Sequence, residues 1–445
     1  MKKSIKTLLP ILFLFFAFNT SAQDTWEAAE QTNEPQKRHE NAAVKVGDLF
    51  VVLGGRGIKT VDIFDTKTNT WKRGKKPPIE MSHFQAVSYH GLVYVMGGLN
   101  GSWPSETPLR HIYIYDPLLD LWTVGPEIPK DRLRGAAGVA VYQDKFYLVC
   151  GIINGHTSGW VSWLDEYDPA TNTWRKLPDA PRARDHFQAA VVGDELVVTG
   201  GRKSGYMGQG FEATIAETDV YNFKTGEWRT LPSPSGDIPT QRAGCTAVVD
   251  GNKLIVIGGE SGSQVEAHSE VEALDLAAGT WEKMPSLMKG RHGTQVILFE
   301  GNLYIAAGCG NRGGSPELNS FETYSLSDAA EEEMAYMPST LGFSTDKLDF
   351  GIVMPYASKT FEIELSNAKG SQGILLTYLV ATNPESYQVD FPFELPYLLK
   401  PSASVQVSIH FTPKSAEAAK GELLIKQADT GRKQPLMIEL VGNGE

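Results

Sequence analysis

A glycine-terminated apolar segment recurs six times between residues 51 and 308, and this repeat constrains the fold more than any other feature of the sequence. Each copy is a short β-type run that ends in Gly-Gly or a close variant: 51–55, 94–98, 147–151, 197–201, 255–259 and 304–308. Successive copies are 43, 53, 50, 58 and 49 residues apart. A repeat of this length indicates units that cannot bury their apolar faces alone and therefore pack against one another, as in a β-propeller.

Two further registers keep a constant offset from the glycine pair. Sixteen residues before the first position of each pair stand Arg38, Met81, Arg134, Arg184, Arg242 and Arg291. After the pair, an apolar or aromatic residue precedes a tryptophan by seven positions in five copies, at Trp71, Trp122, Trp174, Trp228 and Trp281. With these markers, roughly residues 24–330 resemble the kelch-repeat family. The resemblance implies an all-β fold, namely a six-bladed kelch β-propeller.

The sixth copy lacks its tryptophan, because position 331 is Glu331. Trp26 stands twelve residues before Arg38, a spacing typical of the other copies. We therefore predict a propeller over residues 23–335, closed by an N-terminal strand near Trp26. Such closure removes open sheet edges.

A different pattern follows residue 340. Alternating apolar residues, such as Phe361, Ile363 and Leu365, indicate short half-buried strands. We predict an immunoglobulin-like β-sandwich over 340–445. Its opening segment 348–353 and its closing segment 440–444 resemble hydin-like or choice-of-anchor domains. Few buried contacts are expected between this domain and the propeller.

Residues 1–22 are predicted to be a signal peptide. Lys2, Lys3 and Lys6 precede an apolar run over 8–18, and small residues follow at 20–22. Eleven apolar residues span roughly half of a 30 Å hydrocarbon layer, so no transmembrane segment is expected. The chain should be an exported protein of bacterial type, periplasmic or extracellular.

The charge balance is acidic. Without the three N-terminal lysines, 38 basic residues stand against 53 acidic ones, a net charge of −15. This balance disfavours nucleic acid as a partner, because phosphate binding needs a basic face. The three cysteines form no CxxC pair. We therefore predict no metal and no cofactor.

Strand direction places the candidate ligand-binding residues. The loop after each glycine pair and the segment before each marker should lie on one face, around the mouth of the central channel. These loops are long, and long loops on a rigid scaffold usually carry binding residues. The predicted ligand-binding residues are aromatic or charged: Arg56, His83, Trp103, His156, Trp160, Trp163, Arg202, Tyr206, Glu260 and Arg312. Packing beneath its own loop is the alternative role for each aromatic residue, and bonding of loop carbonyls is favoured for the marker arginines.

Two functions fit this arrangement. The favoured one is a binding protein whose propeller face captures a glycan or an extracellular protein, since an exposed Trp can stack on a sugar ring and Arg can hold a carboxylate. The alternative is a carbohydrate-active enzyme, a mutarotase or epimerase that resembles exported sialic-acid mutarotases. That reaction needs an acid and a base near an arginine, and no spacing singles one pair out. The candidate catalytic residues are Glu212, Glu260, His186 and Arg242.

Overall fold

The structure is a computed structural model that describes residues 25–326, 341–367, 373–427 and 435–444. The predicted signal peptide and the junction around 327–340 lie outside the described residues. Among the described residues, no helix is both long and apolar enough to cross a membrane.

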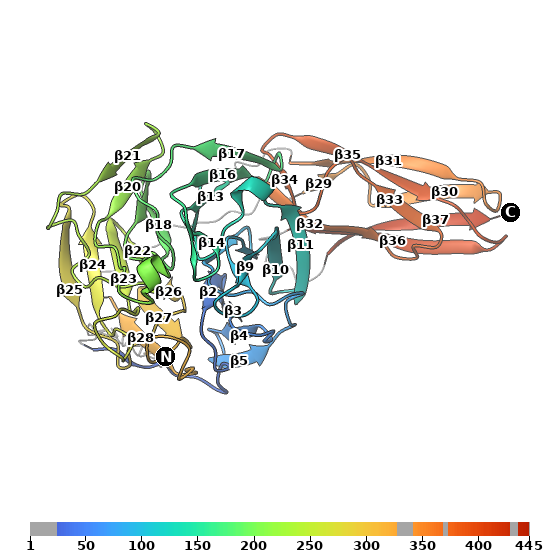
Figure 1. Cartoon of the computed structure of the whole chain (residues 1–445). Coiled ribbons are helices and arrows are strands. Elements are labelled where there is room, and N and C mark those ends of the chain that lie inside the picture. Colours follow the sequence, from blue (N-terminus) through green and yellow to red (C-terminus); the bar gives the residue numbers. More distant parts are fainter. Residues whose placement is uncertain (1–24, 327–340, 368–372, 428–434, 445) are drawn as a thin grey trace, which may run out of the picture.

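Residues 27–325 form six four-stranded antiparallel sheets (Figure 1). Sheet 1 contains β2 (Asn41–Val46), β3 (Leu49–Gly54), β4 (Asp62–Asp65) and β5 (Thr70–Arg73). Sheet 2 contains β6 (Ala86–Tyr89), β7 (Leu92–Val95), β10 (His111–Asp116) and β11 (Leu121–Glu127). Sheet 3 contains β12 (Gly138–Tyr142), β13 (Lys145–Val149), β16 (Leu164–Asp168) and β17 (Thr173–Leu177).

Sheets 4 to 6 repeat this order. Sheet 4 contains β18 (Ala189–Val192), β19 (Glu195–Val198), β20 (Asp219–Asn222) and β21 (Glu227–Thr230). Sheet 5 contains β22 (Thr246–Asp250), β23 (Lys253–Ile257), β24 (Val271–Asp275) and β25 (Thr280–Met284). Sheet 6 contains β26 (Val296–Phe299), β27 (Asn302–Ala306), β28 (Phe321–Ser325) and β1 (Glu27–Ala28).

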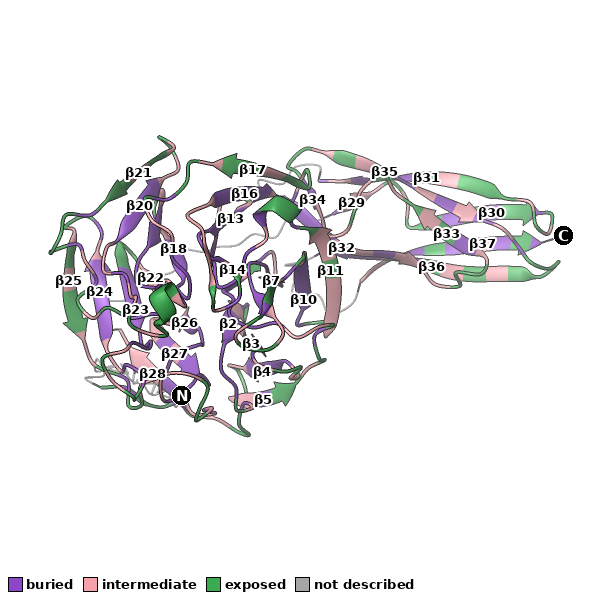
Figure 2. Cartoon of the chain, viewed as in Figure 1, coloured by how far each residue is buried: buried purple, intermediate pink, exposed green. Residues whose placement is uncertain are grey.

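The first strands of the six sheets contact one another in a closed order, β2–β6–β12–β18–β22–β26 and back to β2. The second strand of each sheet is mostly buried, whereas the fourth strand is mostly half-buried or exposed (Figure 2). This gradient explains why the glycine-terminated runs are continuously apolar: both of their faces pack against neighbouring sheets.

The sixth sheet joins the two ends of this ring. In β1, Glu27 pairs with Thr323 of β28, and Ala28 pairs with Glu322. Trp26 is buried, stacks on Tyr324 at 5.6 Å and donates from Nε1 to the carbonyl of Pro285 at 2.9 Å. The N-terminal segment therefore supplies the outer strand of the sixth sheet.

The five marker arginines form a buried layer that ties each sheet together. Each is less than 2% exposed and donates to the carbonyl of the first position of its own glycine pair, as Arg184 does to Gly200 at 2.8 Å. Each also pairs with a carboxylate on the third strand, Arg184 with Asp219 at 2.7 Å. This confirms the structural role favoured from the sequence. We call this set the arginine layer: Arg38, Arg134, Arg184, Arg242 and Arg291.

The C-terminal region forms two further sheets. One contains β29 (Gly342–Phe343), β31 (Lys359–Ser366), β35 (Ser404–Phe411) and β33 (Tyr387–Asp390). The other contains β30 (Lys347–Val353), β37 (Leu436–Gly444), β36 (Ala418–Gln427), β32 (Ile374–Ala381) and β34 (Tyr397–Leu399). Apolar residues of both sheets, including Ile363 and Leu440, share one core.

These C-terminal sheets extend from the side of the ring that holds β10 and β11 (Figure 1). Lys426 of β36 pairs with Asp116 of β10 at 2.6 Å, and both side chains are less than 10% exposed. Leu375 and Leu398 join an apolar cluster of sheets 2 and 3. The contacts between the two regions are few, in line with the expectation from the sequence, but they include this buried ion pair.

Candidate ligand-binding site at the channel mouth

A ring of backbone hydrogen bonds surrounds the axis of the six sheets. Its members stand two residues after each marker, and each N–H donates to the carbonyl of the preceding member at 2.7–3.1 Å. Asn41 N closes the circle by donating to Gly293 O at 3.0 Å. All six members have φ between 49° and 63°, a left-handed conformation that costs free energy in residues other than glycine. We call this set the inner ring: Glu40, His83, Ala136, His186, Gly244 and Gly293.

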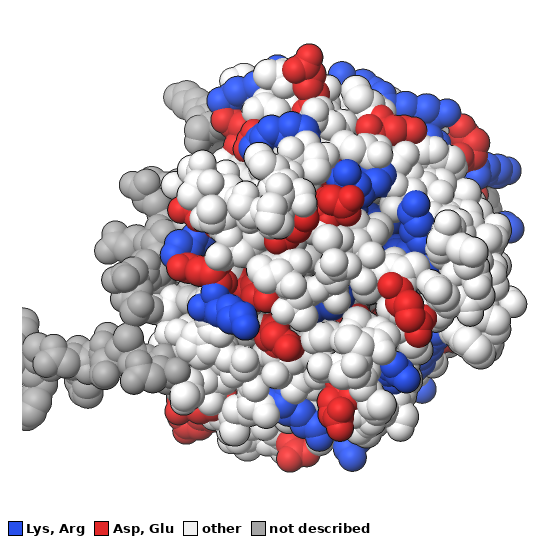
Figure 3. Space-filling view, turned by 60° about the vertical axis from the view of Figure 1, so that its left-hand side comes forward, with Lys and Arg blue, Asp and Glu red and all other residues white. Residues whose placement is uncertain are grey.

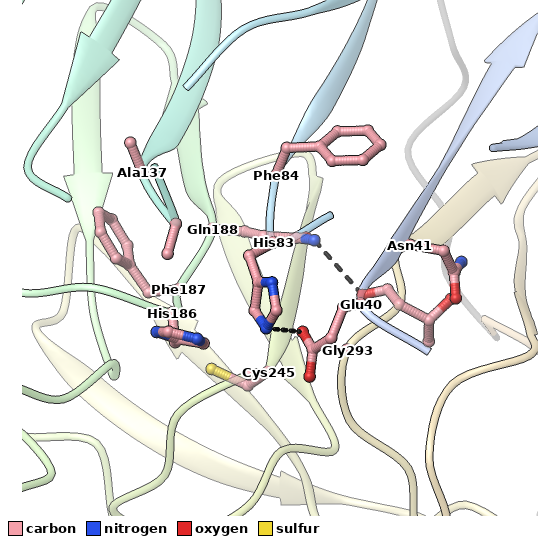
Figure 4. Close-up of a pocket in the computed structure, with 13 residues that line it drawn as sticks. Glu40, Asn41, His83, Phe84, Ala137, His186, Phe187, Gln188, Cys245 and Gly293 are labelled. Atoms are coloured by element: carbon pink, nitrogen blue, oxygen red, sulfur yellow. Dashed lines mark hydrogen bonds and ion pairs between the residues drawn. The ribbon is translucent and has the colours of Figure 1, made fainter. Parts of the chain in front are cut away.

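The inner ring surrounds a small cavity of about 40 Å³ that is lined by residues of all six sheets. This volume holds a few water molecules but not a sugar ring. Figure 4 shows His83 in the cavity wall between Glu40 and His186. The Glu40 carboxylate lies 3.4 Å from Nε2 of His83. The cavity at the channel mouth therefore has mixed walls, in which Glu40, His83 and His186 stand beside the apolar Phe84 and Phe187.

Three histidines gather at one side of the cavity. His156 comes from the loop between β14 (Ile152–Asn154) and β15 (Ser158–Trp160), and its Nε2 lies 3.0 Å from Nε2 of His186. The His83 ring lies 4.8 Å from that of His156 and 4.9 Å from that of His186, between centroids. Burial lowers the pKa of His83 and of His186, so both imidazoles are neutral at pH 7.

Two of these imidazoles are each bonded through Nδ1 to a carboxylate. His186 Nδ1 bonds to Asp185 at 2.5 Å, and Asp185 also accepts from the Ser204 hydroxyl at 2.6 Å. His156 Nδ1 bonds to Glu106 at 3.0 Å. Burial alone would raise the pKa of Glu106, but the interactions with His156, a backbone N–H and Arg56 together outweigh it, and the pKa falls to about 2. Glu106 is therefore a carboxylate at neutral pH.

The other side of the mouth is a network of opposite charges. Arg202 bonds to Glu260 at 2.5 Å, and His292 lies 3.4 Å from Glu260 and 3.6 Å from Glu40. Burial alone would lower the pKa of His292, but Glu260 and Glu40 raise it to about 10. Burial alone would raise the pKa of Glu260, but His292 and Arg202 lower it to about 2. His292 is therefore an imidazolium between two carboxylates.

The loops above the inner ring contact one another in a circle that we call the rim: 56–59, 99–108, 152–160, 202–214, 260–268 and 309–318. The contacts run from loop to loop and are polar. They are Arg56 to Glu106 at 2.6 Å, Glu106 to His156, Trp160 Nε1 to Ser204 O at 2.8 Å, Gly262 N to Phe211 O at 3.1 Å, Arg312 to Gly262 O at 3.1 Å, and Lys59 to Glu317 at 2.8 Å. The strand pair β8 (Leu99–Asn100) and β9 (Thr107–Pro108) and the 3-10 turn η2 (Tyr206–Gly208) stiffen two of these loops.

Nine of the ten predicted ligand-binding residues take part in the contacts of the rim or mouth just described, or stand exposed on the rim. Trp103 is 69% exposed, and Trp160 meets the exposed Tyr206 edge to face at 5.6 Å. Arg312 and Arg202 both lie over the ring of Phe211, with guanidinium carbons 5.6 and 5.2 Å from its centroid. Trp163, in contrast, packs against the guanidinium of Arg132 at 4.1 Å and serves its own sheet.

The candidate catalytic residues separate in the structure. His186 and Glu260 lie at the mouth, whereas Arg242 belongs to the arginine layer and pairs with Glu272. Glu212 is exposed and accepts from the N–H of Phe211 at 3.0 Å. Sequence reasoning missed Glu40, Glu106, Asp185 and His292 as site residues. A signal existed for Glu40, which stands at the same offset from its marker as His83 and His186.

A larger groove lies elsewhere, between sheets 4 and 5. It has a volume of about 490 Å³ and is lined by Pro234, Pro239 and Trp281 among others. One acidic side chain, Asp237, is among its lining residues. On the face that Figure 3 shows, basic and acidic side chains are interspersed over the surface.

Comparison with known proteins shows where this architecture belongs. The Attractin/LZTR1 beta-propeller family matches residues 11–268. Kelch-like protein terF of Aspergillus terreus is 28% identical over 321 residues, which is 67% of each chain. Kelch-like protein 25 of Xenopus tropicalis is 27% identical over 271 residues, and the human protein of that name is 28% identical over 265. The matches cover 59% and 57% of this chain but only 43% and 42% of those relatives.

A solved structure, that of YjhT, has the same fold in this region. It superposes with a TM-score of 0.54 at 17% sequence identity. The match covers 65% of this chain and 95% of that one.

Proposed function

The chain belongs to the Attractin/LZTR1 beta-propeller family and carries a kelch-type propeller. On this premise we propose that it is an exported six-bladed propeller that binds a glycan or an extracellular protein through its rim. The proposed propeller spans residues 23–335, and its export rests on the predicted signal peptide. The C-terminal sheets would form an immunoglobulin-like sandwich that acts as a spacer or attachment module.

The exposed apolar residues of the rim carry this proposal. Trp103 is 69% exposed, Met207 is 82% exposed, and Tyr206, Val265 and Ile58 are also exposed. Large apolar side chains that are exposed to solvent on structured loops mark interaction surfaces. The cavity beneath them has only about 40 Å³, whereas pockets that enclose small ligands have about 300–1,000 Å³. A partner is therefore expected to lie across the rim.

Arrays of immobilised glycans and of immobilised secreted proteins test this function. Trp103→Ala and Tyr206→Ala should each weaken binding by about 1–3 kcal/mol, as expected for aromatic anchors at the centre of an interface. Asn252→Ala is the matched control, because Asn252 is exposed in the turn between β22 and β23 at the opposite end of its strands. Loss of binding in Asn252→Ala with unchanged binding in both rim variants would contradict the proposal.

A second function, that of a sugar mutarotase or epimerase, is favoured by one observation. Glu260 is ionised, His292 is protonated, and Arg202 touches Glu260, so a base, an acid and a guanidinium meet at the mouth. Anomer exchange of sialic acid, followed by NMR, should then be faster with the protein than without it, and Glu260→Gln should abolish the increase. Exchange at the uncatalysed rate would exclude this reaction for that sugar.

A further inference from the structure

We propose that His83, His156 and His186 bind one divalent transition-metal ion at the channel mouth, with an open coordination position toward the central cavity. The inference does not depend on the identity of any partner at the rim. It rests on the arrangement of three imidazoles and of the groups that hold them.

The ligand atoms converge. One nitrogen from each of the three histidines lies within 4.8 Å of the others, and the closest pair, Nε2 of His156 and Nε2 of His186, is 3.0 Å apart. Nitrogens that share a tetrahedral zinc ion at about 2.0–2.1 Å are separated by roughly 3.3 Å. The pair already stands close to that spacing, and His83 must approach by about 1.5 Å at most to join it.

The proton positions direct two of these nitrogens toward each other. Nδ1 of His186 bonds to Asp185 and Nδ1 of His156 bonds to Glu106. A carboxylate can only accept, so both Nδ1 atoms carry protons, and each ring has only its Nε2 left to bind another group. The two Nε2 atoms face each other at 3.0 Å, where they share a proton in the absence of metal, and a metal ion bound to both would replace that proton.

The carboxylates are also the partners that metal-binding histidines usually have. A ligating imidazole almost always donates its second N–H to a carboxylate, a carbonyl or water, which fixes its tautomer and its orientation. His186 and His156 each have such a carboxylate, and His83 Nδ1 bonds to the Ser82 hydroxyl at 2.9 Å. Among the described residues, this is the one group of three or more His, Cys, Asp and Glu side chains with such spacing.

The surroundings suit an ion with an exchangeable ligand. Three histidines with a free position are typical of open zinc sites, and imidazole also suits copper, nickel and iron. The cavity of about 40 Å³ beside His83 and His186 has room for an ion and water. The Glu40 carboxylate, 3.4 Å from His83 Nε2, is placed to accept from a metal-bound water or to bind the ion. The side chain of His156 is 11% exposed, so an ion can reach this histidine from the rim.

Metal titration of the purified, tag-free protein tests the site. After chelator treatment, Zn²⁺ is added in competition with a chromophoric chelator, and Co²⁺ is added to read the absorption bands of a four- or five-coordinate ion. We expect one tight equivalent per chain. His156→Ala should weaken Zn²⁺ binding by more than about 100-fold, and Glu106→Gln by about 10–100-fold, the usual effect of losing a carboxylate behind a ligand.

His268→Gln is the matched control. Its imidazole is buried and also bonds to a carboxylate, that of Glu270 at 3.0 Å, but it is not part of the three-histidine group. Its affinity for Zn²⁺ should equal that of the unmodified protein. X-ray absorption of the unmodified Zn²⁺-loaded protein should show three imidazole ligands, a result that requires no variant to fold. Absence of a tight equivalent, unchanged affinity in His156→Ala, or fewer than two imidazole ligands would overturn the proposal.

Discussion

The arginine layer and the inner ring stand only two residues apart in each repeat, yet their side chains vary in opposite ways. The arginine layer is nearly the same in every sheet: five of six positions are arginine, and each binds the same carbonyl and a carboxylate on the same strand. The inner ring keeps its backbone bonds but changes its side chains, from Glu40 and His83 to Gly244 and Gly293. A side chain that repeats with the sheets serves the scaffold, whereas one that departs from the repeat is free to serve a ligand.

The strongest test of this contrast removes one member of the arginine layer. Arg242→Met should lower the free energy of unfolding by about 3–5 kcal/mol, because the carboxylate of Glu272, fully buried beside Arg242, would lose this ion pair. Urea unfolding measures the change. Arg229→Met is the control, since Arg229 and its partner Glu195 are substantially exposed and the pair contributes about 0–1 kcal/mol. Equal losses of unfolding free energy in the two variants would contradict the distinction between the arginine layer and surface ion pairs.

Trp26 should behave as part of the repeated scaffold. Trp26→Ala should lower the free energy of unfolding by about 3 kcal/mol, the low end of the range for a core tryptophan, because Trp26 is buried but directly precedes a strand of only two residues, β1. Thermal unfolding followed by circular dichroism gives the change. An unmoved melting temperature would show that β1 does not hold the ring closed.

The charges of the mouth should make stability depend on pH. Folding raises the pKa of His292 from its ordinary 6.5 to about 10. A group with a raised pKa stabilises the fold fully below its unfolded pKa, and this contribution disappears as pH rises through the folded pKa. The melting temperature should therefore fall between pH 6.5 and 10, and His292→Gln should flatten this decline. His410→Gln, at a half-exposed histidine of β35, should keep the slope of the unmodified protein; a slope that His292→Gln leaves unchanged would contradict the assignment.

The smallest effect is expected at the rim. Trp103→Ala should change the free energy of unfolding by no more than about 0.5 kcal/mol, because the side chain is 69% exposed. The same urea experiment measures it. A loss comparable with that of Trp26→Ala would mean that the rim tryptophan supports the fold and is not available to a partner.

The sequence predicts the repeated part of the molecule and much less of the rest. The glycine pairs, the tryptophans and the marker arginines recur at fixed offsets, so their role could be inferred, and the kelch-type propeller is confirmed by the family match. The sequence places His156 at the mouth but does not predict its contact with His186, because no marker recurs in the rim loops that would fix the position of His156 relative to the inner ring. Trp163 shows the reverse case: an aromatic residue in a long loop turned inward onto Arg132.

The contacts between the C-terminal sheets and sheet 2 could not be predicted from the sequence, for a different reason. Lys426 and Asp116 are single charged residues about 310 positions apart, in unrelated patterns. No local period links them, and an isolated lysine in a strand is usually solvated. Only the folded chain shows that this pair is buried and joins the C-terminal sheets to sheet 2.

The pairing of β1 with β28 also has a kinetic consequence. Trp26 binds the carbonyl of Pro285, 259 positions away, and the partner strand of β1 comes later still. During synthesis, β1 is made first but cannot pair until β28, near the end of the ring, has been made. Contacts of such large sequence separation form slowly, since the loop between them must be closed first. The ring is therefore expected to close in a late, slow step, during which the outer edge of β28 is open to pairing with the wrong chain.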